Sequence, residues 1–315
     1  MAEIVLVHGI NHHLETADGV ESAWIPALAG GVRLAGRPDL ADRLRLPIGS
    51  PGRIECRTAY YGDLFRAPDQ QGAGDDLRDL TAEQQALAES LALEWLARLA
   101  ERAPADSREA AQAGQLLEMI RDPEAAQAQG GRNVLREITR MLARAPWLAH
   151  SVMYLAERSV KRALNQVTRY LTDDAIRSRA REAVMAQIGD DTKVLIGHSL
   201  GSVVAYECAH RLTRPLPLLV TLGSPLGLRT IVTARLDPPP SFPPMVEKWL
   251  NHANLEDYVA AEPDLRPLFG ENTPFASRLK CQHYQERGSD PHRVETYLGR
   301  AAVGEAVIEA VDNGS

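Results

Sequence analysis

The sequence predicts an α/β protein in which a mostly parallel sheet of about six strands is covered by helices and interrupted by a large all-helical insertion. Two observations predict this class. Short apolar or β-branched runs end in turn residues and are separated by stretches of helical periodicity, as in parallel sheets. Between the second and third runs, from about residue 75 to residue 188, Ala, Leu, Glu, Arg and Gln dominate, which favours nearly continuous helix.

Each expected strand is a short run with a turn signal after it. The run Lys193–Ile196 is almost continuously apolar, which fits a strand buried in the centre of a sheet. In chain order the expected strands are Ile4–Val7, Arg53–Tyr60, Lys193–Ile196, Leu216–Leu222, Val246–Leu250 and Cys281–Gln285.

The helical segment carries its own start signal and its own apolar stripes. Thr81 and Gln84 have the spacing of a capping box, which marks the first turn of a helix. Apolar residues then recur at every fourth position from Leu87 to Leu99, and a second stripe runs from Leu148 to Leu171. Such stripes are most simply the packed core of a helical unit, although a dimer surface or an interfacial lid would have the same pattern.

Composition and charge exclude several classes of function. The chain has 315 residues and a net charge of −7, so it offers no basic footprint for nucleic acid. Its three cysteines, Cys56, Cys208 and Cys281, are odd in number and far apart, which is typical of a reducing compartment. We find neither a signal peptide nor an apolar run near the ~18 residues that span a bilayer, and we expect a cytoplasmic protein. Transient contact with a membrane surface and a homodimer both stay open.

The clearest chemical signal is the segment Gly197-His198-Ser199-Leu200-Gly201. A buried strand precedes this G-x-S-x-G and helical spacing follows it, which is the context of a nucleophile elbow. Side chains two residues before and after the serine would collide with the neighbouring strand and helix, so glycine is required there. The alternative is an ordinary strand-to-helix turn in which Ser199 caps the helix.

At this segment the chain resembles the α/β-hydrolase superfamily, whose lipase, esterase and thioesterase members carry such an elbow. The resemblance extends over Ala2–Tyr61 and Asp191–Leu298. It implies a three-layer α/β-hydrolase fold with residues 1–63 and 190–315 as the core, and residues 64–189 as a helical cap or lid. Two departures from the superfamily's pattern mean that the substrates of its members cannot be assigned to this chain. The expected sheet begins directly at the strand before His8-Gly9, and the helical insertion precedes the elbow.

The resemblance also implies an oxyanion hole. The first strand runs into His8-Gly9-Ile10, and in the superfamily the amide after H-G and the amide after the nucleophile bind the oxyanion. These amides are those of Ile10 and Leu200, whereas a simple turn after a strand is the plainer interpretation of His8-Gly9. The adjacent pair His12 and His13 has no further ligands at metal spacing, so we expect a solvated loop and neither a metal nor a cofactor.

The remaining members of a triad should follow the serine in the order acid, then histidine. Asp257 follows the strand that starts at Val246 and is the expected acid, with Glu256 and Asp264 as the alternatives. His292 precedes the C-terminal helix and is the expected base. Its competitor His283 lies within an expected strand, from which it could not easily reach Ser199.

These residues predict a serine hydrolase that cleaves carboxylic esters through an acyl-enzyme, on a small-molecule or lipid substrate with a hydrophobic acyl chain. A thioesterase or an acyltransferase would use the same triad. A non-catalytic binding or signalling module on the same frame is the alternative from another class, because fold analogy alone does not establish catalysis.

Overall fold

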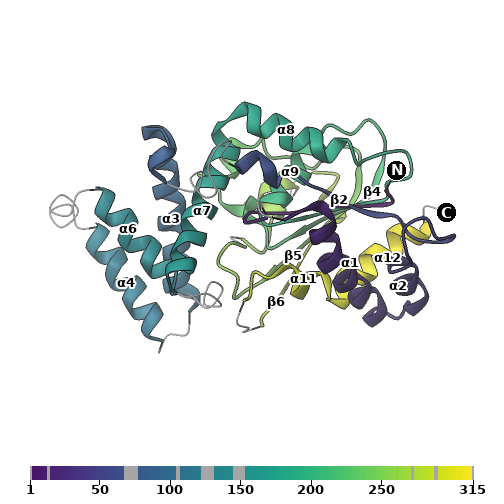
Figure 1. Cartoon of the computed structure of the whole chain (residues 1–315), viewed down its shortest axis with the longest axis horizontal. Helices are drawn as coiled ribbons and strands as arrows, with labels where there is room; N and C mark the ends of the chain where they lie inside the picture. The colour runs from purple at the N-terminus through teal and green to yellow at the C-terminus, as the bar shows by residue number, and fades with distance from the viewer. Residues whose placement is uncertain are drawn as a thin grey trace.

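A computed structural model describes residues 2–12, 15–66, 77–103, 107–121, 131–144, 153–260, 262–270, 273–286 and 290–313. Within these ranges the chain forms one six-stranded sheet in which every paired neighbour is parallel, in the order β2-β1-β3-β4-β5-β6 (Figure 1). The predicted α/β class and the number of strands are therefore confirmed. The strands are β1 (Ile4–Val7), β2 (Cys56–Ala59), β3 (Val194–His198), β4 (Leu216–Leu222), β5 (Val246–Asn254) and β6 (Leu279–Tyr284).

The strand bounds differ from the sequence prediction mainly in β5. This strand continues past Leu250 to Asn254 because it pairs with β4 on one side and β6 on the other along that stretch. Its last residues include Asn251 and His252, both buried, whose polarity concealed the extension in the sequence. The other differences are smaller: β2 is shorter than expected at both ends, β3 continues to His198, and β6 begins at Leu279 and ends at Tyr284.

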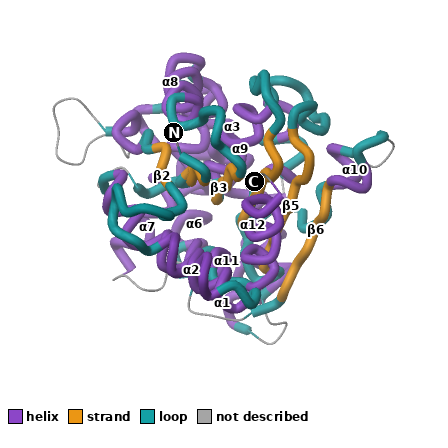
Figure 2. The backbone as a smooth tube through the Cα atoms, turned by 90° about the vertical axis from the view of Figure 1, so that its right-hand side faces the viewer, coloured by secondary structure: helices purple, strands orange, loops and turns teal. Residues whose placement is uncertain are grey.

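Helices cover both faces of the sheet, which gives three layers. Alternate strand residues such as Ile4 and Leu6 pack on α1 (Ala17–Leu34), α2 (Pro38–Leu44), α11 (Val294–Leu298) and α12 (Ala301–Asn313). Val5 and Val7 face the opposite layer, where α8 (Asp174–Met185) packs beside α9 (Leu200–Ala209). Figure 2 shows α8 and α9 on one side of the sheet and α1, α2 and α11 on the other.

The order of the strands creates a crevice at the carboxyl ends of β1 and β3. The chain leaves β1 for β2 through α1 and α2 on one face, and leaves β3 for β4 through α9 on the other. Because the two connections diverge, the ends of these neighbouring strands are left open between them. Such a switch point is where open α/β sheets bind ligands.

The long helical segment of the sequence is confirmed in the described residues. It contains α3 (Ala82–Arg102), α4 (Arg108–Arg121), α6 (Gly131–Leu142), α7 (Met153–Thr172) and α8, whereas the short α10 (Arg266–Phe269) follows β5. Thr81 and Gln84 form the predicted capping box at the start of α3. The stripe from Leu87 to Leu99 is buried, and Val160 to Leu171 of the second stripe pack in the same core, whereas Leu148 and Val152 lie outside the described residues.

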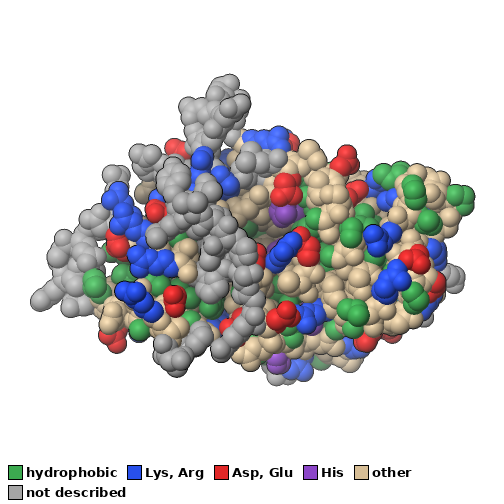
Figure 3. All heavy atoms as spheres, turned by 60° about the horizontal axis from the view of Figure 1, so that its bottom comes forward, with side chains coloured by type: hydrophobic (Ala, Val, Ile, Leu, Met, Phe, Trp, Pro, Cys, Tyr) green, Lys and Arg blue, Asp and Glu red, His purple; other side chains and the backbone are tan. Residues whose placement is uncertain are grey.

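Helices α3, α4, α6 and α7 lie beyond the carboxyl ends of the strands, on the left in Figure 1. Two side chains connect them to the loops there. Gln166 of α7 accepts a hydrogen bond from the Asn11 amide after β1, and Arg102 at the end of α3 reaches the loop after β5. The helices described here include none that is long and apolar enough to cross a bilayer. On the face seen in Figure 3, basic and acidic side chains are interspersed.

Candidate active site

Ser199 stands at the sharp turn between β3 and α9. Its backbone has φ 53° and ψ −130°, a left-handed conformation that costs roughly 1–3 kcal/mol for a residue with a side chain. A side chain on Gly197 would meet the carbonyl oxygen of Gly201 at 2.5 Å, and one on Gly201 would collide with the carbonyl oxygen of Val7. The two glycines therefore have the steric reason that the sequence predicted. Ser199 makes no capping hydrogen bond to α9, which removes the simpler interpretation of this serine.

The loop after β1 passes directly against Ser199. A Cβ on Gly9 would lie 2.6 Å from Cβ of Ser199, so only glycine allows this approach. His8 holds the loop from the other side: its Nε2 accepts from the Tyr61 amide at 3.0 Å, and its carbonyl accepts from the Tyr61 hydroxyl at 2.5 Å. Burial lowers the pKa of His8 to about 3, which keeps the ring neutral as this acceptor role requires.

The two amides expected to form an oxyanion hole lie at the ends of neighbouring strands. Ile10 follows β1 and Leu200 follows β3, and neither amide donates a hydrogen bond to another described residue. Asn11, beside Ile10, has φ 69°, and its amide donates to Oε1 of Gln166 at 2.9 Å. The turn thus directs the Asn11 amide to α7 and leaves the Ile10 amide available.

Asp257 lies in the loop that follows β5 and is 1% exposed. Its Oδ1 accepts from the amides of Val259 at 2.9 Å and Ala260 at 3.4 Å. From α3, Arg102 donates to the carbonyl oxygens of Asp257 and Ala260, each at 3.0 Å. These contacts hold the loop, so that the second carboxylate oxygen is presented to the side chains that face it.

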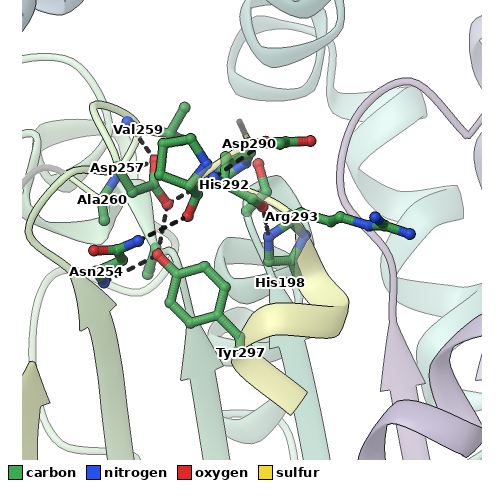
Figure 4. A network of polar contacts seen from close by, with 12 residues as sticks. His198, Asn254, Asp257, Val259, Ala260, Asp290, His292, Arg293 and Tyr297 are labelled. Atoms are coloured by element: carbon green, nitrogen blue, oxygen red, sulfur yellow. Dashed lines mark hydrogen bonds and ion pairs between the residues drawn. The ribbon is translucent and has the colours of Figure 1, made fainter. Parts of the chain in front are cut away.

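His292 is one of those side chains. Its Nδ1 donates to Oδ2 of Asp257 at 2.7 Å, and its carbonyl oxygen accepts from Nε2 of His198 at 2.9 Å (Figure 4). Burial alone would lower the pKa of His292, but the charge and hydrogen bond of Asp257, with the charge of Asp290, raise it above its ordinary value. Because Nδ1 carries the proton that Asp257 accepts, the neutral ring has its lone pair on Nε2.

Ser199 and His292 line the same cavity, which has a volume of about 430 Å³. Residues of the β1 loop, α1, α7 and the segment before α11 complete its walls, and most of the described lining is polar or charged. The lining residues are Ile10, Asn11, His12, Glu15, Ala23, Trp24, Ser159, Arg162, His198, Ser199, Asp290, His292, Arg293, Val294 and Glu295.

The alternatives for acid and base lie elsewhere. Oε1 of Glu256 accepts from the side-chain Nε2 of Gln285 at 2.6 Å, and Asp264 forms an ion pair with Arg266. His283 is an exposed residue of β6. The structure therefore pairs His292 with Asp257, as the order along the chain predicted.

The histidine pair after H-G is described only in part. His12 lies against Glu15, with Nδ1 3.0 Å from Oε2, and His13 lies outside the described residues. In the part of the chain that the structure describes, no three His, Cys, Asp or Glu residues are grouped so that they could hold a metal ion.

Four further residues contribute to the site without having been predicted. They are Tyr61, which fixes His8, Arg102 and Gln166 from the helical insertion, and Tyr297, whose hydroxyl donates to Asp257. Arg102 and Gln166 lie on long amphipathic helices, where a polar residue looks like part of the solvated face, and Tyr297 lies on the short α11, where its ring looks like ordinary core packing. Only the tertiary contacts distinguish them.

No protein-family model, curated protein or solved structure matches this chain. The geometry of the site therefore carries the functional inference by itself.

Proposed function

We propose that this chain is a serine hydrolase of the α/β-hydrolase type that cleaves carboxylic esters, with Ser199 as nucleophile, His292 as base and Asp257 as acid. The observation that carries the proposal is the hydrogen bond between His292 and Asp257 beside a serine held in a strained left-handed turn. The turn of Ser199, the loop of Asp257 and the segment of His292 are far apart in sequence and converge here at the carboxyl ends of the strands. Structural stability alone does not require such convergence.

In the proposed reaction His292 Nε2 removes the hydroxyl proton as Ser199 Oγ attacks the ester carbonyl. The negative charge that develops on the carbonyl oxygen is stabilised by the amides of Ile10 and Leu200. The imidazolium, stabilised by Asp257, then returns the proton to the departing alcohol, and an acyl-enzyme remains. His292 then takes a proton from water as the water oxygen attacks this acyl group, and returns the proton to Ser199 Oγ as the carboxylic acid departs.

The helical insertion would act in this scheme as a cap. Gln166 and Arg102 connect it to the loops of the proposed oxyanion hole and acid, so its docking and the site geometry would be linked. The apolar stripes of the insertion pack in the core and do not line the cavity, so the hydrophobic acyl group is proposed from the apolar composition of the insertion alone, whereas the polar lining of the cavity suits the alcohol portion of the ester. The same residues would equally serve a thioesterase or an acyltransferase.

Labelling with a fluorophosphonate tests the nucleophile, because this reagent phosphonylates activated serines. We expect the wild type to be labelled, and labelling to be lost in Ser199→Ala and strongly reduced in His292→Ala and Asp257→Asn. The matched control is Ser90→Ala, which removes a hydroxyl of α3 that donates only to the Ala86 carbonyl within the same helix and does not line the cavity. Equal labelling of the wild type and Ser199→Ala would show that the nucleophile is wrong, and an unlabelled wild type would favour a binding module.

A panel of short-chain nitrophenyl esters, acyl thioesters and ester substrates with added alcohol acceptors separates the three reactions. Faster turnover of esters than of matched thioesters, without transfer to the acceptor, is expected. A clear preference for thioesters would move the assignment to a thioesterase.

A further inference from the structure

The carboxylate of Asp257 has a second partner on the oxygen that faces His292. The hydroxyl of Tyr297 donates to Oδ2 at 2.7 Å, the same distance as the hydrogen bond from His292 Nδ1. Figure 4 shows the Tyr297 ring reaching from α11 to this carboxylate. Two donors thus share one oxygen of the proposed acid.

The direction of this hydrogen bond is fixed by a third group. The amide of Asn254, at the end of β5, donates to the Tyr297 oxygen at 3.1 Å. A hydroxyl has one proton, and because its oxygen already accepts from Asn254, that proton is committed to Asp257. Burial and the charge of Asp257 raise the pKa of Tyr297 well above its ordinary value, so the hydroxyl remains a donor across the working pH range.

Hydrophobic packing does not account for this hydroxyl. The Tyr297 side chain is fully buried between the sheet and its neighbours, where phenylalanine would fill nearly the same volume without a polar atom. Tyr297 is also five residues after His292, on the helix that directly follows the histidine. One short segment therefore carries both the proposed base and a donor to the acid.

We propose that Tyr297 is a positioning residue of this site, which orients Asp257 and limits how strongly its carboxylate holds the proton on His292. This inference rests on the proposed function for its catalytic meaning. Each donor spreads the negative charge of Oδ2, and hydrogen bonds to charged groups are about twice as strong as neutral ones. Without the hydroxyl, the charge on Oδ2 would act on His292 alone, and the imidazolium would be favoured further.

Other titratable groups also face the pair, and the substitution Tyr297→Phe leaves all of them in the chain. Asp290, in the loop before His292, adds to the raised pKa, and Arg102 acts on Asp257 from α3. His198, at the end of β3, is kept neutral by burial and contacts the His292 ring at 4.6 Å between centroids. Tyr284 of β6 packs against Tyr297. A change seen in Tyr297→Phe therefore reports the lost hydroxyl.

The test compares the pKa of His292 in the wild type and in Tyr297→Phe. The pKa is measured by NMR titration of the imidazole ring, whose resonances are assigned from their absence in His292→Gln. We expect a rise of about 1 unit, because one hydrogen bond to a charged group is removed. Tyr206→Phe is the matched control: Tyr206 is equally buried and donates to the Ser241 carbonyl at 2.9 Å, on the other side of the sheet. An unchanged pKa of His292 in folded Tyr297→Phe would overturn the proposal.

The acid limb of kcat/KM for a nitrophenyl ester should move upward by the same amount, with kcat reduced up to about 10-fold at low pH and KM unchanged. If Tyr297→Phe does not fold, 3-fluorotyrosine at position 297 gives the opposite test, since its stronger donor should lower the pKa of His292. No shift there would equally overturn the proposal. The titration needs no turnover, so it separates failure of this inference from failure of the proposed function, which the fluorophosphonate decides.

Discussion

Replacing Gly9 with alanine should lower kcat/KM for ester hydrolysis by about 100-fold. The added Cβ would lie 2.6 Å from Cβ and 3.2 Å from Oγ of Ser199. Carbon atoms in contact are ordinarily about 3.5–4.0 Å apart, so either Ser199 or the loop that carries the Ile10 amide must move by about 1 Å. A displacement of that size at a reacting centre costs on the order of 100-fold, or about 2.7 kcal/mol of transition-state stabilisation.

The assay compares kcat/KM for a nitrophenyl ester and the rate of fluorophosphonate labelling in Gly9→Ala and in Gly30→Ala. Gly30 lies in α1, where an added Cβ meets nothing within 4 Å. Alanine there should leave activity unchanged and stabilise the helix by about 0.5–1 kcal/mol. Wild-type activity in a folded Gly9→Ala protein would refute the idea that the H-G loop and Ser199 form one site.

Three further results are expected. Glu207 of α9 is fully buried and its carboxylate accepts a hydrogen bond from Arg177 of α8. Because Glu207→Gln leaves the Arg177 charge without its partner, it should lower the free energy of unfolding by about 3–5 kcal/mol in urea titrations. A loss under about 1 kcal/mol would contradict a buried ion pair. Burial lowers the pKa of His8 to about 3 and of His252 to about 4, so the unfolded chain binds more protons below pH 6.5. Stability should therefore fall as pH falls, by about 2 kcal/mol per histidine between pH 6.5 and 5, and urea midpoints that do not change with pH would contradict this. Finally, a nitrophenyl ester series should favour medium or long acyl chains if the apolar insertion receives them, whereas an acetyl preference would exclude that role.

Much of the fold could be predicted because its signals are local. The runs at Ile4–Val7, Lys193–Ile196 and Leu216–Leu222 are largely apolar, and the capping box at Thr81 and Gln84 involves residues within one turn. The end of β5 could not be predicted, since Asn251 and His252 are polar residues that the sheet buries. Asn251 is tolerated there because its Oδ1 accepts from the Thr221 hydroxyl on the adjacent strand, a contact between residues thirty positions apart.

The sequence by itself predicted the sharp turn at Ser199, because the apolar strand, the G-x-S-x-G spacing and the helical periodicity that follows are local signals. The contact that requires Gly201, with the carbonyl oxygen of Val7 in β1, is set by packing. The sequence also limited the proposed acid and the proposed base to a few candidates. Only the tertiary structure decided that His292 pairs with Asp257 rather than with Glu256, and that Tyr297 shares the same carboxylate oxygen. Hydrogen bonds between side chains depend on distances of a few tenths of an ångström between distant segments, and packing sets those distances.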